Sequence, residues 1–239
     1  MAKFLHWNIN GVNTHYEDLR LLVHNHKPKV VALQETLNSS FTLSGFNIYH
    51  KRENTNARGI SLLIDNSLVS SDIVLQTNLE AIAARVTVCK KTYTFCNLYL
   101  SPSKTYSSAD IENILDQLPR PVVLMGDFNA HHPLWGSASS SPRGDVLVDV
   151  FSLRNLCVLN DGSTTYLRDY DNYTSCLDLT VVDPAIVLDF NWCVLDDTHG
   201  SDHYPVVLTS TSSEEEEKEE RYNLNKANWP LFEDINPDH

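Results

Sequence analysis

The stretch "VVLMGDFNAHHPLWGSASSSPRG", residues 122–144, decides how the rest of the chain is interpreted. Its first four residues form a short apolar run that is typical of a buried strand. An acid and an amide, Asp127 and Asn129, follow directly. On an extended backbone, side chains two residues apart point to the same side, so both are predicted to face one pocket while Phe128 enters the core. Gly-Asp-x-Asn is also a common turn, so this stretch alone leaves a site and a turn as alternatives.

Other predicted strands also end in side chains that can bind a metal or transfer a proton: Asn8, Glu35, Tyr99, Asp178, Asp202 and His203. Polar residues gathered at strand ends are how α/β enzymes build their sites. Asp178 is the hardest of these to explain as a surface residue, because Leu177 and Leu179 flank it and a buried acid needs a partner. His203 is the candidate partner, since an acid raises the pKa of an imidazole and orients its ring.

Hydrophobic periodicity predicts many strands and few helices. Helices are expected around Leu19–His26, before Pro28, then after a capping Ser108, and around Leu147–Phe151. The expected strands are Lys3–Asn8, Val30–Leu33, Ile60–Ile64, Ile82–Val88, Tyr93–Leu100, Val122–Met125, Cys157–Leu159, Leu177–Val182, Trp192–Leu195 and Val206–Leu208. This excess of strands favours a four-layered α/β sandwich, with two packed, mainly antiparallel sheets flanked by helices, over one doubly wound sheet.

The chain of 239 residues is predicted to hold one domain over residues 1–210. Residues 211–239 are expected to be an acidic linker, disordered, followed by the start of a further segment. The net charge is -13, of which residues 214–220, with six Glu and one Lys, supply a net -5 and leave -8 for the rest. An acidic body argues against tight, unspecific binding to phosphate backbones and fits a protein that handles divalent cations.

The five cysteines include no C-x-x-C pair and lie beside apolar residues. They are expected to be buried, reduced thiols, which disfavours a structural zinc or a disulfide framework. No signal peptide is expected at the N-terminus, and no apolar run is long enough to cross a membrane.

Six motifs occur in one order along the chain: "WNING", "LQET", "NLYLSP", "GDFNAHHPLWGS", "SCLDLTVVD" and "GSDHYPV". This ordered set resembles the endonuclease/exonuclease/phosphatase superfamily, of the apurinic-endonuclease-like kind, over residues 3–209. Within it, "GDFNAHHPLWGS…RGDVLVDVF…LNDGSTTY…SCLDLTVVDP" is similar to the endonuclease domain of non-LTR (LINE-type) retrotransposons. The later segment "RYNLNKANWPLF" is similar to the one that precedes their reverse transcriptase.

The resemblance implies a role for each matching position. Glu35, Asn8 and Asp202 would hold a divalent cation, Mg²⁺ or in its place Mn²⁺. Asp127 would activate the attacking water, Asn129 would orient that water or the phosphate, and Tyr99 would hydrogen-bond the scissile phosphate. His203, oriented by Asp178, would stabilise the charge that develops on phosphorus. Thr165 and Ser201 would support phosphate or active-site contacts. The residues expected to contact DNA are Thr165, Arg168, Tyr170, Tyr173, Ser201 and Arg143.

The resemblance further implies a Mg²⁺-dependent endonuclease that nicks double-stranded target DNA in the nucleus, after synthesis in the cytoplasm. The 3′-OH at the nick would prime reverse transcription by an enzyme that follows in the same polypeptide. Residues 166–174, "YLRDYDNYT", are expected to form a projecting β-hairpin that probes the DNA groove, although an ordinary surface loop is the alternative. Further basic residues in expected loops are Lys51, Arg52, Arg58 and Lys104.

Three alternatives stay open at this point. One is a phosphatase or phosphodiesterase of the same superfamily that acts on a phospholipid, an inositol phosphate or a nucleotide. Another is repair of abasic DNA, which would need a pocket for the flipped sugar. The third is a binding module without activity, against which the complete set of catalytic residue types argues, because binding alone does not require it.

Overall fold

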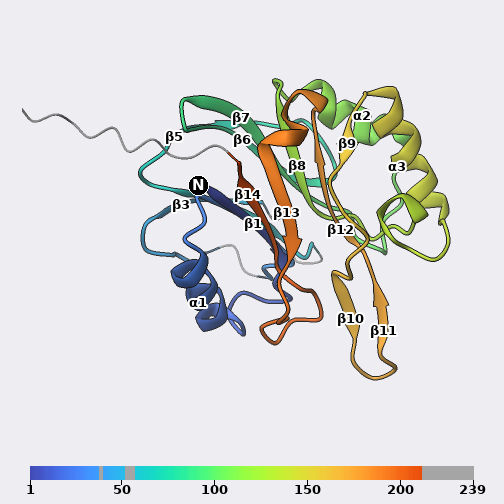
Figure 1. Ribbon diagram of the computed structural model, residues 1–239, viewed down its shortest axis with the longest axis horizontal. Coiled ribbons are helices and arrows are strands. Elements are labelled where there is room, and N and C mark those ends of the chain that lie inside the picture. Colours follow the sequence, from blue (N-terminus) through green and yellow to red (C-terminus); the bar gives the residue numbers. More distant parts are fainter. Residues whose placement is uncertain (38–39, 52–56, 212–239) are drawn as a thin grey trace, which may run out of the picture.

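The computed structural model describes residues 1–37, 40–51 and 57–211 (Figure 1). Two six-stranded sheets pack face to face, and helices cover their outer faces. The predicted four-layered sandwich is therefore confirmed. The predicted linker lies outside the described residues from residue 212 onward.

The first sheet contains the N-terminal strand at its centre. Its strands, in spatial order, are β13 (Phe190–Val194), β14 (Val206–Ser210), β1 (Lys3–Asn8), β2 (Val30–Gln34), β4 (Ile60–Asp65) and β3 (Phe46–Lys51). Only β1 and β2 run parallel, with Asn8 beside Gln34 in the register. α1 (Tyr16–His26) connects these two strands and covers the outer face of the sheet.

The second sheet repeats this arrangement. Its strands, in spatial order, are β5 (Val69–Ile73), β6 (Glu80–Val88), β7 (Lys91–Tyr99), β8 (Val122–Asp127), β12 (Asp178–Val182) and β9 (Cys157–Val158). Here β7 and β8 form the parallel pair, and Asp127 lies beside Asp178 in the antiparallel pair β8–β12. α2 (Ser108–Asp116) and α3 (Pro142–Leu153) cover its outer face.

A buried apolar layer holds the sheets together, because the inner faces of both contribute aromatic and branched side chains. Phe4 and Phe95, from opposite sheets, have ring centroids 4.9 Å apart in this layer. Gly126 lets β7 and β8 approach closely: a Cβ at this position would lie 2.0 Å from the carbonyl oxygen of Leu98. The strand that carries Asp127 can therefore pair as it does only with glycine at 126.

Three local predictions need correction. The N-cap of α2 is Ser107 instead of Ser108, and the Asp110 carboxylate accepts hydrogen bonds from its amide (2.8 Å) and hydroxyl (2.7 Å). Two of the five free cysteines, Cys89 and Cys193, are exposed. The edge strands β3 and β5 were not predicted, since their largely exposed or half-buried residues leave no clear apolar alternation.

The topology brings the functional positions to one edge of the sandwich. The parallel pairs end together, so the carboxyl ends of β1 and β2, and those of β7 and β8, lie at this edge. β12 and β14 run antiparallel to their neighbours, so the residues at their start lie there too. A small two-stranded sheet, β10 (Tyr166–Arg168) and β11 (Tyr173–Ser175), projects from the same edge (Figure 1).

Candidate active site

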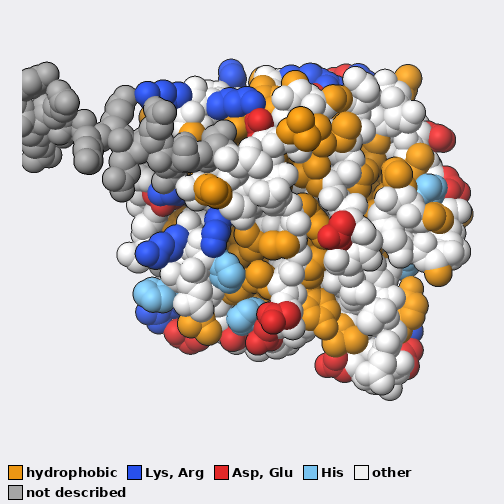
Figure 2. All heavy atoms as spheres, viewed as in Figure 1, with side chains coloured by type: hydrophobic (Ala, Val, Ile, Leu, Met, Phe, Trp, Pro, Cys, Tyr) orange, Lys and Arg blue, Asp and Glu red, His pale blue; other side chains and the backbone are white. Residues whose placement is uncertain are grey.

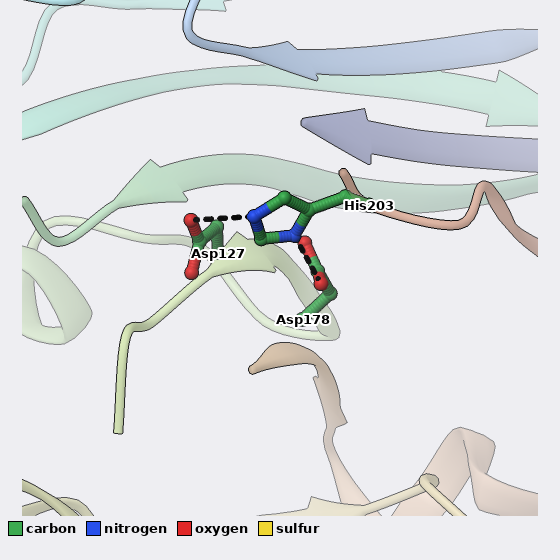
Figure 3. A group of neighbouring side chains, drawn as sticks. All are labelled: Asp127, Asp178 and His203. Atoms are coloured by element: carbon green, nitrogen blue, oxygen red, sulfur yellow. Dashed lines mark hydrogen bonds and ion pairs between the residues drawn. The ribbon is translucent and has the colours of Figure 1, made fainter. Parts of the chain in front are cut away.

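The imidazole of His203 lies between two buried acids, Asp127 and Asp178 (Figure 3). Its Nδ1 is 2.8 Å from Asp178 Oδ2, and its Nε2 is 3.9 Å from Asp127 Oδ2. Asp178 starts β12, Asp127 ends β8, and His203 lies in the loop before β14. The sequence predicted the Asp178–His203 contact, and the structure places these two side chains together.

Burial and charge oppose each other at this group. Burial alone lowers the pKa of His203, but the negative charge of Asp178, its hydrogen bond, and the charges of Asp127 and Asp202 together raise that pKa well above its usual range. Burial raises the pKa of Asp127, and the Asp178 charge adds to the effect, against the His203 charge and the hydrogen bonds from Asn8 and Asn129. The arrangement therefore favours an imidazolium beside a carboxyl group that can take a proton near neutral pH.

Amide groups surround Asp127. Its Oδ2 accepts hydrogen bonds from the side chains of Asn8 (3.0 Å) and Asn129 (2.9 Å), and its Oδ1 accepts one from the Asn129 backbone (2.9 Å). Asn129 was expected to be extended, but its φ of 46° is left-handed, a conformation that asparagine tolerates. The two side chains meet nevertheless, and Phe128 is buried as predicted. These bonds leave the Asp127 carboxylate in a defined orientation.

Asp178 is held through its backbone. Thr165 Oγ1 accepts hydrogen bonds from the amides of Leu177 and Asp178, both at 3.0 Å, and the Asn160 side chain donates to the Asp178 carbonyl at 2.8 Å. The second carboxylate oxygen of Asp178, Oδ1, is buried and has no hydrogen-bond partner among the described residues. Asp178 is thus fixed in place with one oxygen on His203 and one unpaired.

Glu35 lies directly after β2, and both of its carboxylate oxygens are engaged. Oε1 accepts a hydrogen bond from the Tyr99 hydroxyl at 2.6 Å, while Oε2 pairs with the Arg58 guanidinium, with Nε at 2.8 Å and Nη2 in closer contact. The φ of Glu35 is 52°, a strained value for a residue with this side chain. Hydrogen bonds from Gly11 to the Glu35 carbonyl (2.8 Å) and from Thr36 to Gly59 (3.0 Å) hold the backbone there.

A buried amide pair joins the two sheets beneath Glu35 and Tyr99. Gln34 Nε2 donates to Asn97 Oδ1 at 2.7 Å, and Asn97 Nδ2 donates to the carbonyls of Leu33 and Ser61 at 2.9 Å. Gln34 directly precedes Glu35, and Asn97 lies two positions before Tyr99. The pair therefore fixes the strand ends from which Glu35 and Tyr99 extend.

The oxygen-rich set proposed from the sequence for a metal is chemically suited to a hard divalent cation. Glu35 and Asp202 supply carboxylates and Asn8 a side-chain carbonyl. Asn10 links the two acids, because its Oδ1 lies 3.4 Å from Arg58 Nη2 and its Nδ2 lies 3.5 Å from Asp202 Oδ1. The guanidinium of Arg58 places a positive charge on Glu35 in this structure, so a metal ion at this carboxylate would meet that guanidinium.

A second group could also hold a metal ion. Asp127, Asp178 and His203 offer ligand atoms that all lie within 4.8 Å of one another. The hydrogen bond between His203 and Asp178 already uses one atom of each, and a protonated imidazole offers no ligand atom. In that protonation state this cluster offers fewer ligand atoms than its three side chains suggest.

The predicted hairpin is present. Arg168 pairs with Tyr173 in the register of β10 and β11, and the tip comprises residues 169–172. The Arg168 guanidinium forms two hydrogen bonds with Asp171 (3.0 and 2.7 Å) and lies against the rings of Tyr170 (5.0 Å) and Tyr173 (4.7 Å). Tyr170 is 82% exposed and Tyr173 41%. The two aromatic rings are thus available at the tip, while the charge of Arg168 is paired.

Three of the residues expected at the phosphate or DNA form hydrogen bonds within the protein, and for Thr165 and Ser201 these are active-site contacts. Thr165 is fully buried, and its hydroxyl oxygen serves the Asp178 strand. Ser201 is also buried; its hydroxyl donates to the Asn8 carbonyl (2.8 Å) and accepts from the His203 amide (3.2 Å). Arg143 lies at the start of α3 and donates to the carbonyls of Leu100, Lys104, Phe128 and Asn129. In this structure they organise the loops around the site and present little to a ligand.

Sequence reasoning missed three neighbours of the site. Arg58 was noted only as a basic loop residue, and Asn10 was part of a motif without a role. Tyr166 packs its ring 4.9 Å from that of His203 and forms an isolated β-bridge with it. The amide of Leu167 also donates to the Asp202 carbonyl at 2.8 Å. The base of the hairpin is therefore joined to the segment that carries Asp202 and His203, a contact between residues too distant in sequence to be predicted.

Comparison with known sequences identifies proteins to which this chain is similar. Residues 93–207 match the family described as "Endonuclease-reverse transcriptase". The chain is 28% identical over 212 residues to the RNA-directed DNA polymerase from mobile element jockey of Drosophila melanogaster, covering 84% of this chain and 23% of that protein. It is 24% identical over 221 residues to the probable RNA-directed DNA polymerase from transposon BS of the same organism, covering 87% and 24%. The chain thus spans about a quarter of the length of these relatives.

Solved structures share the fold. The endonuclease domain of TRAS1, a telomere-specific non-LTR retrotransposon, superposes with a TM-score of 0.76 at 19% identity, over 87% of this chain and 97% of that one. The AP endonuclease LMAP from Leishmania major gives a TM-score of 0.71 at 14% identity, over 87% and 86%. Among the described residues, no helix has the length and apolar character needed to cross a membrane.

Fold and comparisons together define a hydrolase fold of the endonuclease/exonuclease/phosphatase superfamily, the class to which AP endonucleases belong. Within this class the chain is similar in sequence to RNA-directed DNA polymerases of transposable elements and in fold to the endonuclease domain of a non-LTR retrotransposon. The resemblance inferred from the sequence is thereby confirmed.

Proposed function

We propose that this domain is a Mg²⁺-dependent endonuclease that nicks one strand of a DNA duplex. The observation that carries the proposal is the placement of His203 between Asp127 and Asp178, at the same edge of the sandwich as Glu35. Phosphodiester cleavage adds negative charge to the phosphoryl oxygens in the transition state, and a buried imidazolium meets that charge. A carboxylate whose pKa burial raises is suited to take the proton of the attacking water.

The side chains of the site divide the tasks of the proposed reaction. Asp127 accepts a proton from water, the water oxygen bonds to phosphorus, and the bond from phosphorus to the 3′ oxygen breaks. The 3′ oxygen takes up a proton from solvent water, which leaves a 3′-OH and a 5′-phosphate. Asn129 and Asn8 orient Asp127 through their amides, and Asp178 keeps His203 protonated and directed at the phosphate.

Glu35, Asn8 and Asp202 would hold the cation, Mg²⁺ or in its place Mn²⁺. When bound, it would supply positive charge to the scissile phosphate and the leaving oxygen. The Tyr99 hydroxyl donates to Glu35 in this structure and would donate to a phosphate oxygen when DNA is bound.

The polypeptide context is also part of the proposal. The matched relatives are named as RNA-directed DNA polymerases, and the chain covers about a quarter of each. We infer that a reverse transcriptase follows this domain in the complete protein and that the 3′-OH at the nick primes it. Such a reaction uses chromosomal DNA as its target, so the protein would act in the nucleus.

Incubation with supercoiled plasmid tests the proposal. Mg²⁺ should convert the plasmid to the relaxed circle, EDTA should abolish the conversion, and Mn²⁺ should restore it. The ends at the mapped nicks should be extendable by a DNA polymerase, because they carry a 3′-OH. Cleavage confined to abasic sites, or release of phosphate from nucleotides or lipids without nicking, would instead support the related phosphodiesterase activities.

A further inference from the structure

Arg58 occupies the carboxylate that the proposed function assigns to the metal. Two of its nitrogens bind Glu35 Oε2, and Nη2 also lies 3.4 Å from Asn10 Oδ1. The other oxygen of Glu35 is taken by Tyr99. A divalent cation that binds Glu35 must therefore compete with the guanidinium, because two positive charges cannot share one carboxylate oxygen at contact distance without strong repulsion.

The backbone around Arg58 is tied to the Glu35 loop. The amide of Leu37 donates to the Arg58 carbonyl at 2.8 Å, and that of Thr36 donates to the Gly59 carbonyl at 3.0 Å. On the other side, the Gly59 amide donates to the buried carboxylate of Glu80 at 2.7 Å. Because the backbone is held in this way, a guanidinium that loses Glu35 to a metal ion can move only by rotation of the Arg58 side chain. It therefore stays close to Glu35.

The side chain has room for such a rotation. It is 45% exposed, whereas the Glu35 side chain is only 12% exposed. A guanidinium released from Glu35 would still lie near the negative charge of Asp202 and the side-chain amide of Asn10. It would also become accessible to a ligand that approaches from solvent. Its planar set of donors matches the oxygens of a phosphate group.

The surroundings explain why one such arginine would matter. On the face shown in Figure 2, acidic side chains gather along the lower edge, where the hairpin projects, and Lys and Arg side chains lie mainly at the left and top. This distribution repels a phosphate backbone from the hairpin edge in the absence of a cation. A guanidinium that turns outward only after the metal has bound would attract the phosphate backbone once the cation is in place.

We propose that Arg58 is a substrate-phosphate ligand, held by Glu35 until a divalent cation takes that carboxylate. Arg58 thereby couples metal binding to DNA binding, and by thermodynamic linkage DNA also favours metal binding. The proposal rests on the proposed function for the identity of the phosphate, a DNA phosphodiester. Its first part, competition between Arg58 and the metal, concerns only this chain and the cation.

Titration with Mn²⁺ in the absence of DNA tests the competition, with calorimetry as the readout. Arg58→Ala should bind Mn²⁺ about two- to fivefold more tightly than the unaltered protein, the gain that corresponds to loss of a partly exposed ion pair. Arg20→Ala is the matched control, since it removes an exposed Arg–Glu pair on α1 and should leave the affinity unchanged. Equal or weaker Mn²⁺ binding by folded Arg58→Ala would overturn the competition and make Arg58 a support for Glu35.

Binding of a DNA duplex at several salt concentrations tests the second part, with Ca²⁺ as a non-cleaving cation or with EDTA. In Ca²⁺, Arg58→Ala should reduce the slope of log affinity against log salt by about one phosphate contact. In EDTA the variant and the unaltered protein should have the same slope, because Glu35 retains the guanidinium. A difference of equal size in both conditions, or in neither, would overturn the coupling. Neither measurement requires cleavage, so a protein that failed to nick plasmid would refute the proposed function without deciding this inference.

Discussion

His203 Nδ1 and Asp178 Oδ2 lie 2.8 Å apart in a buried pair, and the remaining oxygen of Asp178 has no hydrogen-bond partner among the described residues. The imidazole is thus bound on one side by an acid that has no competing partner, and its Nε2 faces Asp127. This relationship determines which protonation states the site can adopt. It also makes His203 and Asp178 one functional unit.

The rate of nicking should depend on pH with two limbs. The pKa of Asp127 is raised above its ordinary value of 3.8, and the pKa of His203 above its ordinary value of 6.5. Activity should therefore rise with pH as Asp127 loses its proton, and fall at higher pH as His203 loses its proton. Asp178→Asn removes the negative charge that raises both pKa values, so both limbs should move to lower pH, by about one unit or more. A pH–rate profile and the ¹⁵N shifts of His203 would measure this. Asp189→Asn, which removes a charge paired with Lys91 away from the site, is the control.

His203 and Asp178 should give non-additive losses. His203→Ala should slow nicking by about 10²- to 10⁴-fold, and the double alanine variant should be scarcely slower, because Asp178 acts through His203. Single-turnover rates of the two single variants and the double variant make the comparison. Losses that multiply in full would show that Asp178 works independently.

Glu35→Ala should abolish Mg²⁺-dependent nicking while the protein remains folded. The loss should be about three orders of magnitude, because the cation contributes several kcal/mol of transition-state stabilisation. Thermal unfolding checks the fold, and Glu17→Ala, an exposed glutamate paired with Arg20 on α1, is the matched control. Wild-type nicking by Glu35→Ala would mean that the metal binds elsewhere, and the Asp127, Asp178 and His203 group would be the next candidate.

The hairpin tip should influence where the DNA is cut. Replacing residues 169–172 with Gly and Ser removes Tyr170 and the Asp171 partner of Arg168, but none of the proposed catalytic groups. Cleavage should continue with the nicks redistributed, since exposed aromatic rings can pack against sugars or unstacked bases. The readout is a nick map on a defined duplex. An unchanged map at an unchanged rate would exclude the tip as a reader of DNA.

Complete loss of cleavage by a folded tip variant would have a different meaning. Tyr166, at the base of the hairpin, packs against His203, and Leu167 bonds to the Asp202 carbonyl. A tip replacement that disturbed this base would displace the catalytic loop. The ¹⁵N shifts of His203 in the variant distinguish such a displacement from lost DNA contact.

Local periodicity predicted most of the strands, the layered architecture and the polar character of the strand ends, because alternating burial follows the period of a strand. The residues also predicted the pairing of Asp178 with His203, since a buried acid needs a partner. The hairpin was expected only from the family resemblance, with a surface loop as the alternative. Most other hydrogen-bond partners were decided by the tertiary structure. Packing directs the Arg143 guanidinium to backbone carbonyls and the Thr165 hydroxyl to the amides of the Asp178 strand, while the Arg58 guanidinium lies on Glu35. These partners are distant in the sequence, so local sequence patterns carry no information about them. Sheet pairing brings their loops together, and the hydrogen bonds form only once the sheets are in place.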